Sequence, residues 1–395
     1  MAAVVASTGT IACACSAPAQ QLPSNEPHAS IDLCVSPRGA DALGSPESFN
    51  SIQEASRFAK PGATIHILPG IYEGGIMTTA SGTASNPIRY VSDVKWGAKI
   101  VPSSNSTSEM AWDNRGAYVT IDGFDIDGMP YRGGAPWRIG LYTAGAYSIV
   151  TNNRVHNIAA TAPCTGKGGA GIEGDSYYRG SNIDVIGNVV HDIGAAKCRF
   201  IHGIYQTAPG TVANNLVYRI SGWGIHLWHD ANHITIANNT VVNSAIGGLL
   251  VGGGDFINTS GPADYVIVAN NIVFDNMIYG IIEAGRTGSH NLFTHNLSFR
   301  HWIDWRLITS AADHASVSAD PRFLNYVRDG EGDYHLAAGS PAIDAGAPIH
   351  APSSDLDGIS RPHGAGYDIG AYEFAASSSS RPASVVSSNR DQQCR

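Results

Sequence analysis

A short unit of alternating apolar and polar positions recurs along the middle of the chain, and each copy closes on asparagine. In its clearest form the unit reads V-x-N-N-x-V. The closing asparagines are Asn153, Asn188, Asn215, Asn239, Asn271 and Asn296, at intervals of 35, 27, 24, 32 and 25 residues. The interval never falls below about 24 residues, but it exceeds that minimum by a variable amount. This pattern is typical of a solenoid whose coils share one circumference and carry loops of different length.

The segments between these markers read as strands and turns. Runs such as 184–186, 234–236 and 266–268 are rich in β-branched residues and are bounded by glycine and asparagine. We therefore predict an all-β fold, a right-handed parallel β-helix in which each coil adds one strand to each of about three parallel sheets. Stacked asparagines hydrogen-bond along the axis and tolerate left-handed turns, which explains why they recur.

The two ends of a solenoid need covers. Residues 46–60, PESFNSIQEASRFAK, predict an amphipathic capping helix within an N-terminal cap at 40–62. Coils are expected from about 63 to 310, followed by an irregular cover on the last coil at 311–375 and a disordered polar tail at 376–395. Residues 1–25 read as the remnant of a secretory signal, which leaves one domain at 26–375.

Composition and charge narrow the class of protein and partner. The 395 residues include 45 glycines and only 14% charged residues, as in a well-buried protein rich in turns. The net charge of -9 argues against a general nucleic-acid binder. No apolar run approaches the roughly 20 residues of a membrane span, so we expect no such span. From the signal-like N-terminus we expect export to the extracellular space or the periplasm, and we expect a monomer. A lipid anchor at Cys13 or Cys15 is an alternative.

A second repeat, glycine followed by an aliphatic residue, divides the coil into inner and outer positions. Alternation along a strand places five aliphatic residues inside, namely Ile172, Ile204, Ile225, Leu249 and Ile281. Their successors are expected in solvent: Glu173, Tyr205, His226, Leu250 and Ile282. The positions two further on are Asp175, Thr207, Trp228, Gly252 and Ala284. Only the first half of this outer ladder carries chemical groups, so we expect a substrate groove there.

Two loops expected beside the ladder carry cations and cysteines. The stretches APCTGKGGAG and GAAKCRFIHG hold Lys167, Lys197 and Arg199, although the chain has few lysines. Cys164 and Cys198 precede successive Gly-Ile units at similar distances. In stacked coils they would be neighbours, and an oxidising compartment would join them in a disulfide.

Both ends of the chain resemble a known group of proteins. The stretch CVSPRGADALGSPESFNSIQEASRFAKPGATIHILPGIYEGGI resembles the opening of secreted bacterial right-handed parallel β-helix proteins, many of them polysaccharide lyases or glycosidases. The ending, from Asp320-Pro321 through GSPAIDAG to YDIGAYE, is similar to the C-terminal segment often labelled choice-of-anchor Q. The resemblance implies the fold and a polysaccharide substrate. It does not imply one active site, because this group shares its coil and not its catalytic residues.

We predict a lyase that cleaves an acidic, uronic-acid-containing polysaccharide by β-elimination, which needs a cation, a base and an acid. The predicted catalytic set is Lys197, His202, Tyr205, Glu173 and His226. The predicted substrate-binding set is Lys167, Asp175, Arg199, Trp228, His229 and Asp230. Arg199 or Lys167 would neutralise the substrate carboxylate. Lys197 or His202 would take the proton, and Tyr205 would protonate the leaving oxygen.

Two other functions stay open. A glycoside hydrolase would use Glu173 with Asp175 or Asp230 as acid and base. A non-enzymatic glycan-binding solenoid would need only an aromatic platform. Calcium is the one cofactor considered, held by Glu173 and Asp175, although two carboxylates are a weak calcium signature. His156 and His191 recur three residues after the marker asparagine and are expected to form a structural ladder.

Overall fold

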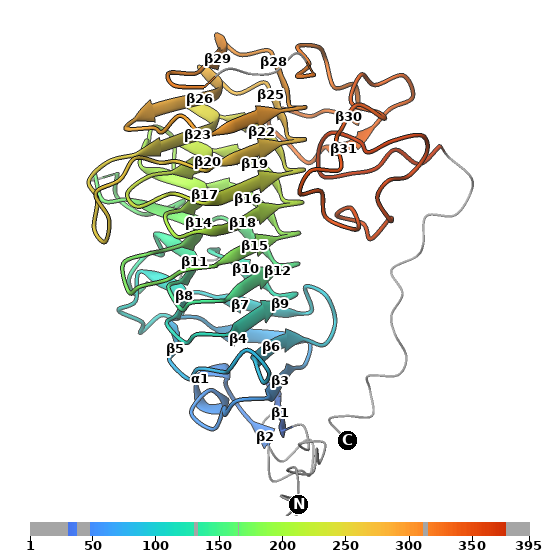
Figure 1. The fold of residues 1–395 in the computed structure, drawn as a ribbon. Coiled ribbons are helices and arrows are strands. Elements are labelled where there is room, and N and C mark those ends of the chain that lie inside the picture. Colours follow the sequence, from blue (N-terminus) through green and yellow to red (C-terminus); the bar gives the residue numbers. More distant parts are fainter. Residues whose placement is uncertain (1–30, 38–47, 130–132, 165, 311–314, 377–395) are drawn as a thin grey trace, which may run out of the picture. The chain divides into compact units, whose positions relative to one another are not determined.

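The computed structural model describes residues 31–37, 48–129, 133–164, 166–310 and 315–376. Within residues 31–310 the chain winds in coils that each add a strand to parallel sheets, as predicted (Figure 1). The predicted signal remnant, Cys13, Cys15, the start of the N-terminal cap and almost all of the tail lie outside the described residues.

Three sheets form the sides of the coil, and neighbouring strands in a sheet are usually three apart along the chain. The first sheet contains β2 (Ser48–Phe49), β1 (Ile31–Val35), β3 (Ala63–Ile67), β6 (Ile88–Ser92), β9 (Val119–Asp122), β12 (Ile149–Thr151), β15 (Asp184–Ile186), β18 (Gly210–Ala213), β21 (Ile234–Ala237), β24 (Ile267–Ala269) and β27 (Leu292–Thr294). The second contains β4 (Gly70–Glu73), β7 (Ala98–Val101), β10 (Asp125–Asp127), β13 (Arg154–His156), β16 (Val189–Ile193), β19 (Leu216–Ile220), β22 (Thr240–Ser244), β25 (Ile272–Phe274) and β28 (Leu297–Phe299). The third contains β5 (Ile76–Thr78), β8 (Met110–Asn114), β11 (Ile139–Thr143), β14 (Gly169–Gly174), β17 (Ile201–Gln206), β20 (Trp223–Leu227), β23 (Gly247–Gly253), β26 (Tyr279–Gly285) and β29 (Ile303–Arg306).

The Gly-aliphatic units form one continuous column inside the coils, which confirms the predicted inner stack. The fully buried members in register across the third sheet are Leu141, Ile172, Ile204, Ile225, Leu249 and Ile281. The glycine before each aliphatic residue lets the next coil approach closely. A Cβ on Gly203 would lie 2.5 Å from the carbonyl oxygen of Gly224 and 2.6 Å from a methyl group of Val217, so a side chain does not fit.

A ladder of asparagine amides runs along the corner between the first and second sheets. The Oδ1 atom of Asn239 accepts hydrogen bonds from the backbone N–H of Asn215 at 3.0 Å and from its Nδ2 at 2.9 Å. The Nδ2 atom of Asn239 donates in turn to Oδ1 of Asn271 at 2.9 Å. The same pattern includes the other fully buried markers, Asn153, Asn188 and Asn296. Each coil therefore fixes the corner of the next.

The asparagines that precede the markers Asn215, Asn239 and Asn271 have a different task. Asn214, Asn238 and Asn270 take the left-handed conformation, with φ of 55°, 53° and 57°. The Nδ2 atom of Asn238 donates to the carbonyl oxygen of Asp368 at 3.1 Å, and that of Asn270 donates to the carbonyl oxygen of Ala347 at 2.7 Å. In these three pairs one asparagine thus stabilises the coil, and the other binds the C-terminal segment.

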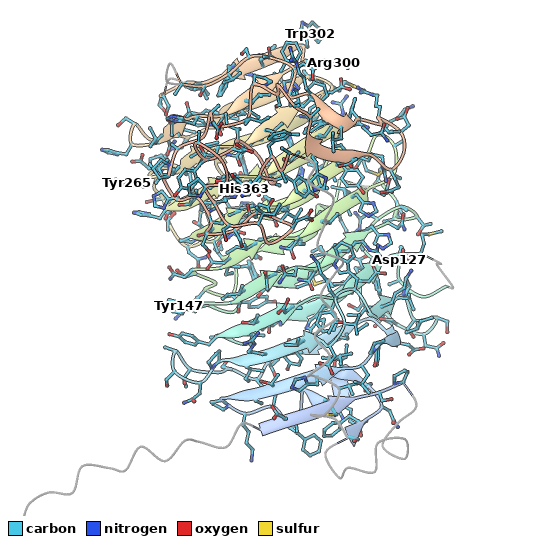
Figure 2. All side chains as sticks on the ribbon, turned by 90° about the vertical axis from the view of Figure 1, so that its right-hand side faces the viewer. Asp127, Tyr147, Tyr265, Arg300, Trp302 and His363 are labelled. Atoms are coloured by element: carbon cyan, nitrogen blue, oxygen red, sulfur yellow. A yellow bond between two sulfur atoms is a disulfide. The ribbon has the colours of Figure 1, made fainter. Side chains whose placement is uncertain are left out.

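The C-terminal segment, residues 315–376, lies along the side of several coils, over the outer face of the second sheet, and is not an end cover on the last coil as predicted (Figure 1). It does touch the last coil, where Val317 pairs with Leu297. It includes the antiparallel pair β30 (Phe323–Asn325) and β31 (Asp333–Leu336). Its apolar residues cover Tyr218, Val242 and Phe274, which the second sheet turns outward. The prediction was wrong because this apolar face needs a cover. At the last coil Trp302 remains 84% exposed (Figure 2).

The N-terminal helix is much shorter than the predicted helix at 46–60. Helix α1 covers only Ile52–Ala55, and the Oγ atom of its N-cap Ser51 accepts a hydrogen bond from the N–H of Glu54 at 3.2 Å. The residues before it, Ser48–Phe49, join the first sheet as β2. Ile52 and Ala55 are buried in the main core, so this one turn still packs on the first coil. In the described part of the chain, no helix is long and apolar enough to cross a membrane.

Replacing Asn239 by Ala removes the acceptor of two buried donors on Asn215, its backbone N–H and its Nδ2 group. We expect the free energy of unfolding to fall by about 3 kcal/mol or more, because unpaired buried donors are costly. Chemical denaturation followed by circular dichroism measures this loss. Asn325→Ala, an exposed residue of β30, is the control and should change stability little. Equal losses in the two variants would contradict the role of the ladder.

Candidate active site

The outer face of the third sheet carries a groove of about 610 Å³. It reaches from Arg199 and Phe200, before β17, to Trp228 and His229, after β20, and Asp255 also lines it. The other residues that line the groove are Gly168, Gly169, His202, Tyr205, Trp223, His226, Ile246, Leu250 and Ala284. Aromatic side chains with a few polar groups are the usual lining of a sugar-binding groove.

The outer ladder has the predicted register, with Glu173, Tyr205, His226, Leu250 and Ile282 paired in sequence across the third sheet. The predicted exposure of its far end was wrong. Leu250 and Ile282 are only 5% and 3% exposed, because they pack in a cluster with Trp223, Trp228 and Tyr279 outside the coil. This cluster gives one end of the groove an apolar floor.

His202 contacts His226, with ring centroids 4.2 Å apart and the ring planes tilted by 41°. Its Nδ1 atom accepts a hydrogen bond from the backbone N–H of Trp223 at 3.2 Å, so the proton of the neutral ring is on Nε2. Burial lowers the pKa of His202 to about 3. His202 is therefore a neutral hydrogen-bond donor, and the structure does not support its predicted role as base. Burial, together with His202 and His229, also lowers the pKa of His226.

Tyr205 is half-buried and stacks on His226, with centroids 5.1 Å apart and an interplanar angle of 16°. Burial raises the pKa of Tyr205, and the carboxylates of Glu173, Asp175 and Asp255 raise it further. The hydroxyl group therefore keeps its proton at neutral pH, as a general acid must.

His229 has the orientation of a general base. Its Nδ1 atom lies 2.9 Å from the backbone carbonyl oxygen of Asp255, which can only accept a hydrogen bond, so Nδ1 carries the proton. The Nε2 atom of the neutral ring then has a lone pair. The centroid of the ring lies 6.1 Å from that of Tyr205. Sequence analysis assigned His229 to substrate binding and missed its partner Asp255.

Trp228 is held against a row of glycines. A Cβ atom on Gly252, Gly254 or Gly285 would come within 2.8 Å of its indole ring. The indole Nε1 donates to the carboxylate of Asp255 at 3.3 Å. The run of three glycines at 252–254 was the sequence signal for this close packing. Trp228 is a rigid wall of the groove for this reason.

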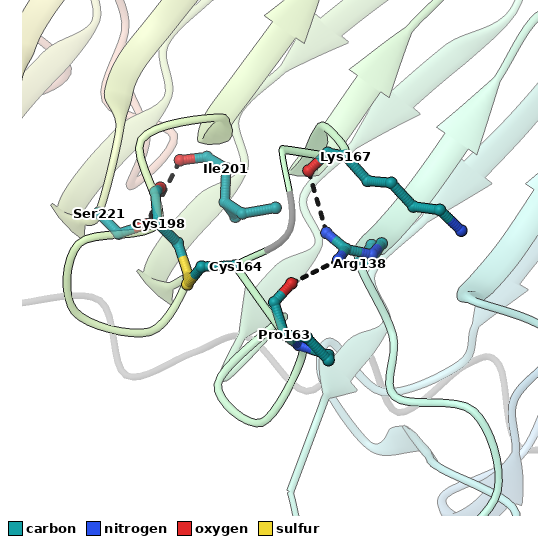
Figure 3. The surroundings of a disulfide bond; sticks show 7 residues. All are labelled: Arg138, Pro163, Cys164, Lys167, Cys198, Ile201 and Ser221. Carbon is teal, nitrogen blue, oxygen red and sulfur yellow. Dashed lines mark hydrogen bonds between the residues drawn. A yellow bond between two sulfur atoms is a disulfide. The ribbon is translucent and has the colours of Figure 1, made fainter.

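Cys164 and Cys198 form a disulfide, which confirms the predicted pair (Figure 3). The guanidinium of Arg138 donates to the carbonyl oxygen of Lys167 at 3.0 Å. The hydroxyl group of Ser221 donates to the carbonyl oxygen of Cys198 at 2.9 Å. These bonds tie both loops to the coil.

The two lysines of these loops lie outside the groove, contrary to the prediction. The ammonium group of Lys167 points away from the disulfide and lies 3.6 Å from the carboxylate of Glu109 (Figure 3). Lys197 is exposed in a turn with φ of 72° and lines a separate cavity of about 140 Å³ beside the disulfide. Arg199 lines this cavity and the groove. Of the three predicted cations, Arg199 alone reaches the groove.

Glu173 and Asp175 have different environments. Burial, and then the charge of Asp175, raise the pKa of Glu173 to about 8. Asp175 is buried and accepts hydrogen bonds from the hydroxyl groups of Tyr142 at 2.6 Å and of Thr207 at 2.8 Å. Thr207 is also buried, although we expected it in solvent. Glu173 is protonated at neutral pH, and the carboxylate oxygens of Asp175 already accept hydrogen bonds from Tyr142 and Thr207. The two residues therefore do not fit calcium, which prefers several ionised oxygens.

Asp230 was predicted to bind sugar hydroxyls, and the structure places it elsewhere. It is 3% exposed. Its carboxylate accepts hydrogen bonds from the backbone N–H groups of Ile257, Asn258 and Thr259 and from the hydroxyl group of Ser176. Burial alone would raise the pKa of Asp230, but these backbone bonds hold it below the usual value. The prediction was wrong because a loop from the next coil encloses the carboxylate.

One group of side chains in the described part of the chain has the spacing of a metal site, His191, Asp192 and Glu331. The Nη2 atom of Arg219 lies 2.5 Å from the carboxylate of Asp192 and 2.9 Å from that of Glu331. The guanidinium of Arg219 thus neutralises the two carboxylates, and we interpret the group as an ion-pair network and not as a metal site. His191 also stacks on His156, with centroids 4.9 Å apart, as the expected structural ladder.

Comparison with known proteins identifies the fold. Residues 111–298 match a family model described as "Right handed beta helix region". The chain is similar to the crystal structure of pectate lyase Pel9A, with a TM-score of 0.53 and 17% identity over 87% of this chain and 96% of that one. It is also similar to the A-module of the Azotobacter vinelandii mannuronan C-5 epimerase AlgE4, with a TM-score of 0.50 and 14% identity over 65% of this chain and 67% of that one. No curated protein matches the chain. At these identities the likeness confirms the right-handed parallel β-helix, while the resemblance of residues 320–373 to choice-of-anchor Q stays a prediction.

Glu173→Gln should change how stability depends on pH. The pKa of Glu173 rises from 4.5 to about 8 on folding, so the folded state binds this proton more tightly. The stability that Glu173 contributes is complete below pH 4.5 and is lost as the pH rises to 8. The Tm of the variant, relative to the wild type, should therefore rise across this window. A constant difference in Tm would show that the carboxyl group is not shifted.

The disulfide should stabilise its loops more than the coil. In Cys164→Ser/Cys198→Ser we expect faster hydrogen exchange in residues 194–200, while the strands of the third sheet exchange as before, because packing holds them independently. Mass spectrometry measures both regions in one experiment. Peptide mapping without reduction should recover the two cysteines linked in the wild type. Two alkylated thiols there would contradict the bond.

Proposed function

We propose that the protein is a lyase that cleaves a uronic-acid-containing polysaccharide by β-elimination. The observation that carries the proposal is the pair of His229 and Tyr205 in the groove. The imidazole of His229 has a free lone pair on Nε2, and the phenol of Tyr205 keeps its hydroxyl proton. Their ring centroids are 6.1 Å apart, so both side chains can reach the same sugar residue of a bound polymer.

The reaction follows from these two groups. His229 Nε2 takes the proton from the carbon α to the substrate carboxylate, and the electron pair of that C–H bond forms the new C=C bond. The C–O bond at the β carbon breaks, and the leaving oxygen takes its proton from the hydroxyl group of Tyr205. The Nε2–H of His202 donates a hydrogen bond to the substrate carboxylate, whose charge grows in the transition state. Arg199 attracts the anionic polymer to the end of the groove.

This proposal moves the role of base from Lys197 to His229. Lys197 lines the cavity beside the disulfide and not the groove. His229 lies in the groove with its tautomer set by a carbonyl oxygen. Trp228 and Trp223 supply apolar faces for sugar rings. The similar structure that is named a pectate lyase adds support for elimination on an acidic polysaccharide.

A glycoside hydrolase is the second candidate, and Glu173 favours it. Its pKa of about 8 keeps it protonated at neutral pH, as a general acid requires. Inverting and retaining hydrolases need a second free carboxylate. Asp175 and Asp230 are both occupied by hydrogen bonds. The carboxylate of Asp255 lines the groove but accepts a hydrogen bond from the indole of Trp228, and Glu173 is not among the residues that line the groove. We therefore rank elimination first.

We propose export from the cytoplasm as well. The disulfide between Cys164 and Cys198 supports this, because such bonds persist in oxidising compartments. A polysaccharide substrate would be met in the same compartment.

The test of the function is a panel of acidic and neutral polysaccharides, including polygalacturonate and alginate. Ultraviolet absorbance of an unsaturated product indicates a lyase. New reducing ends without that absorbance indicate a hydrolase. Binding without either product would favour a glycan-binding solenoid and contradict both enzymatic proposals.

His229→Ala and Tyr205→Phe should each lower turnover by about 10²-fold or more, the usual loss on removing a general base or acid. Thermal stability should change little, since both side chains are only half-buried. The matched controls are His290→Ala and Tyr147→Phe, which replace exposed residues outside the groove. Full activity of both groove variants would place the active site elsewhere.

A further inference from the structure

Asp230 is a buried carboxylate with no place in the reaction, yet it is bound from several sides. The backbone N–H of Thr259 donates to its Oδ1 at 2.7 Å, and the hydroxyl group of Thr259 donates to the same atom at 3.0 Å. The N–H groups of Asn258 and Ile257 donate to Oδ2 at 3.0 and 3.2 Å. The hydroxyl group of Ser176, which lies two coils before Asp230, donates to Oδ2 at 3.2 Å. One side chain thus holds three consecutive residues of the loop that follows β23.

The same loop sets the orientation of His229. Asp255 lies two residues before Ile257, and its carbonyl oxygen accepts the Nδ1 proton of His229 at 2.9 Å. Gly254 forms an antiparallel bridge with the backbone of His229. Asn258 anchors the loop again, through a bond from Nδ2 to the carbonyl oxygen of Ser176 at 2.8 Å. Asp230 follows His229 directly in the chain and also holds the loop that contains Asp255. It therefore fixes both the donor and the acceptor of the Nδ1–H···O=C bond.

We propose that Asp230 is a positioning residue for His229, which clamps the loop at 255–259 so that the Asp255 carbonyl holds the imidazole with Nε2 unprotonated and facing the groove. This inference rests on the proposed function for its effect on turnover. The tautomer itself is independent of any substrate. An exposed loop without the clamp would leave the ring free to exchange its two tautomers.

Asp230→Asn tests the clamp. The amide has one acceptor oxygen in place of two, and its NH₂ group faces backbone donors. Turnover should fall by about 10- to 100-fold, the cost of a slightly misplaced catalytic group. KM should change little, because Trp223, Tyr205 and Arg199 keep their places. Thr259→Val removes only the hydroxyl bond and should give a smaller loss in the same direction.

A measurement on the ring separates positioning from a general loss of structure. Nitrogen NMR of labelled protein, with His229 assigned from the spectrum of His229→Gln, reports the tautomer. The wild type should show one form with the proton on Nδ1, and Asp230→Asn should show both forms. The matched control is Asp264→Asn, which removes a loop-anchoring carboxylate outside the groove, bonded to His290 at 2.7 Å. It should leave tautomer and turnover unchanged.

The outcomes distinguish the two proposals. An Asp230→Asn variant that keeps the wild-type tautomer and full turnover overturns the clamp. A wild type with the proton on Nε2 overturns it as well. A shifted tautomer in a protein that cleaves no polysaccharide would leave the clamp in place and overturn the proposed function.

Discussion

The buried asparagine ladder is the interaction on which the rest of the structure depends. Each amide binds both the side chain and the backbone of the asparagine one coil away, as Asn239 does with Asn215. This contact repeats at one corner from Asn153 to Asn296 and so fixes where each of these coils begins. A slip of one residue would turn the outer groups of the third sheet inward. The alignment of Glu173, Tyr205 and His226 therefore depends on hydrogen bonds at a distant corner.

The groove forms where the outer ladder changes from polar to apolar. Leu250 and Ile282, packed with aromatic rings, make one end dry. Burial acts in opposite directions on the groups along this ladder: it lowers the pKa of His202 and raises those of Tyr205 and Glu173. His202 and Tyr205, which line the groove, are neutral at neutral pH. The groove thus offers uncharged donors to an anionic sugar, with Arg199 at its end.

Contacts between loops of different coils complete the site. Asp230 and Asp255 lie outside the strands of the coil, yet their hydrogen bonds hold the loop beside His229 and Trp228. The loops of this chain differ in length from coil to coil, and their residues are not held in the strand register that the coils share. A rigid repeat with adaptable loops explains how one fold presents a site that a repeat alone would not contain.

The sequence by itself determined the coil, because a period near 24 residues, alternation along strands and paired asparagines are local patterns. It also placed Ile204 and Ile225 inside and brought Cys164 next to Cys198. Only the tertiary structure decided which way loop side chains point and what covers an outer face. The Asp255 carbonyl bonds His229 across 26 residues, and Thr259 bonds Asp230 across 29. No periodicity records such pairs, since their geometry depends on how two loops of unequal length meet in space.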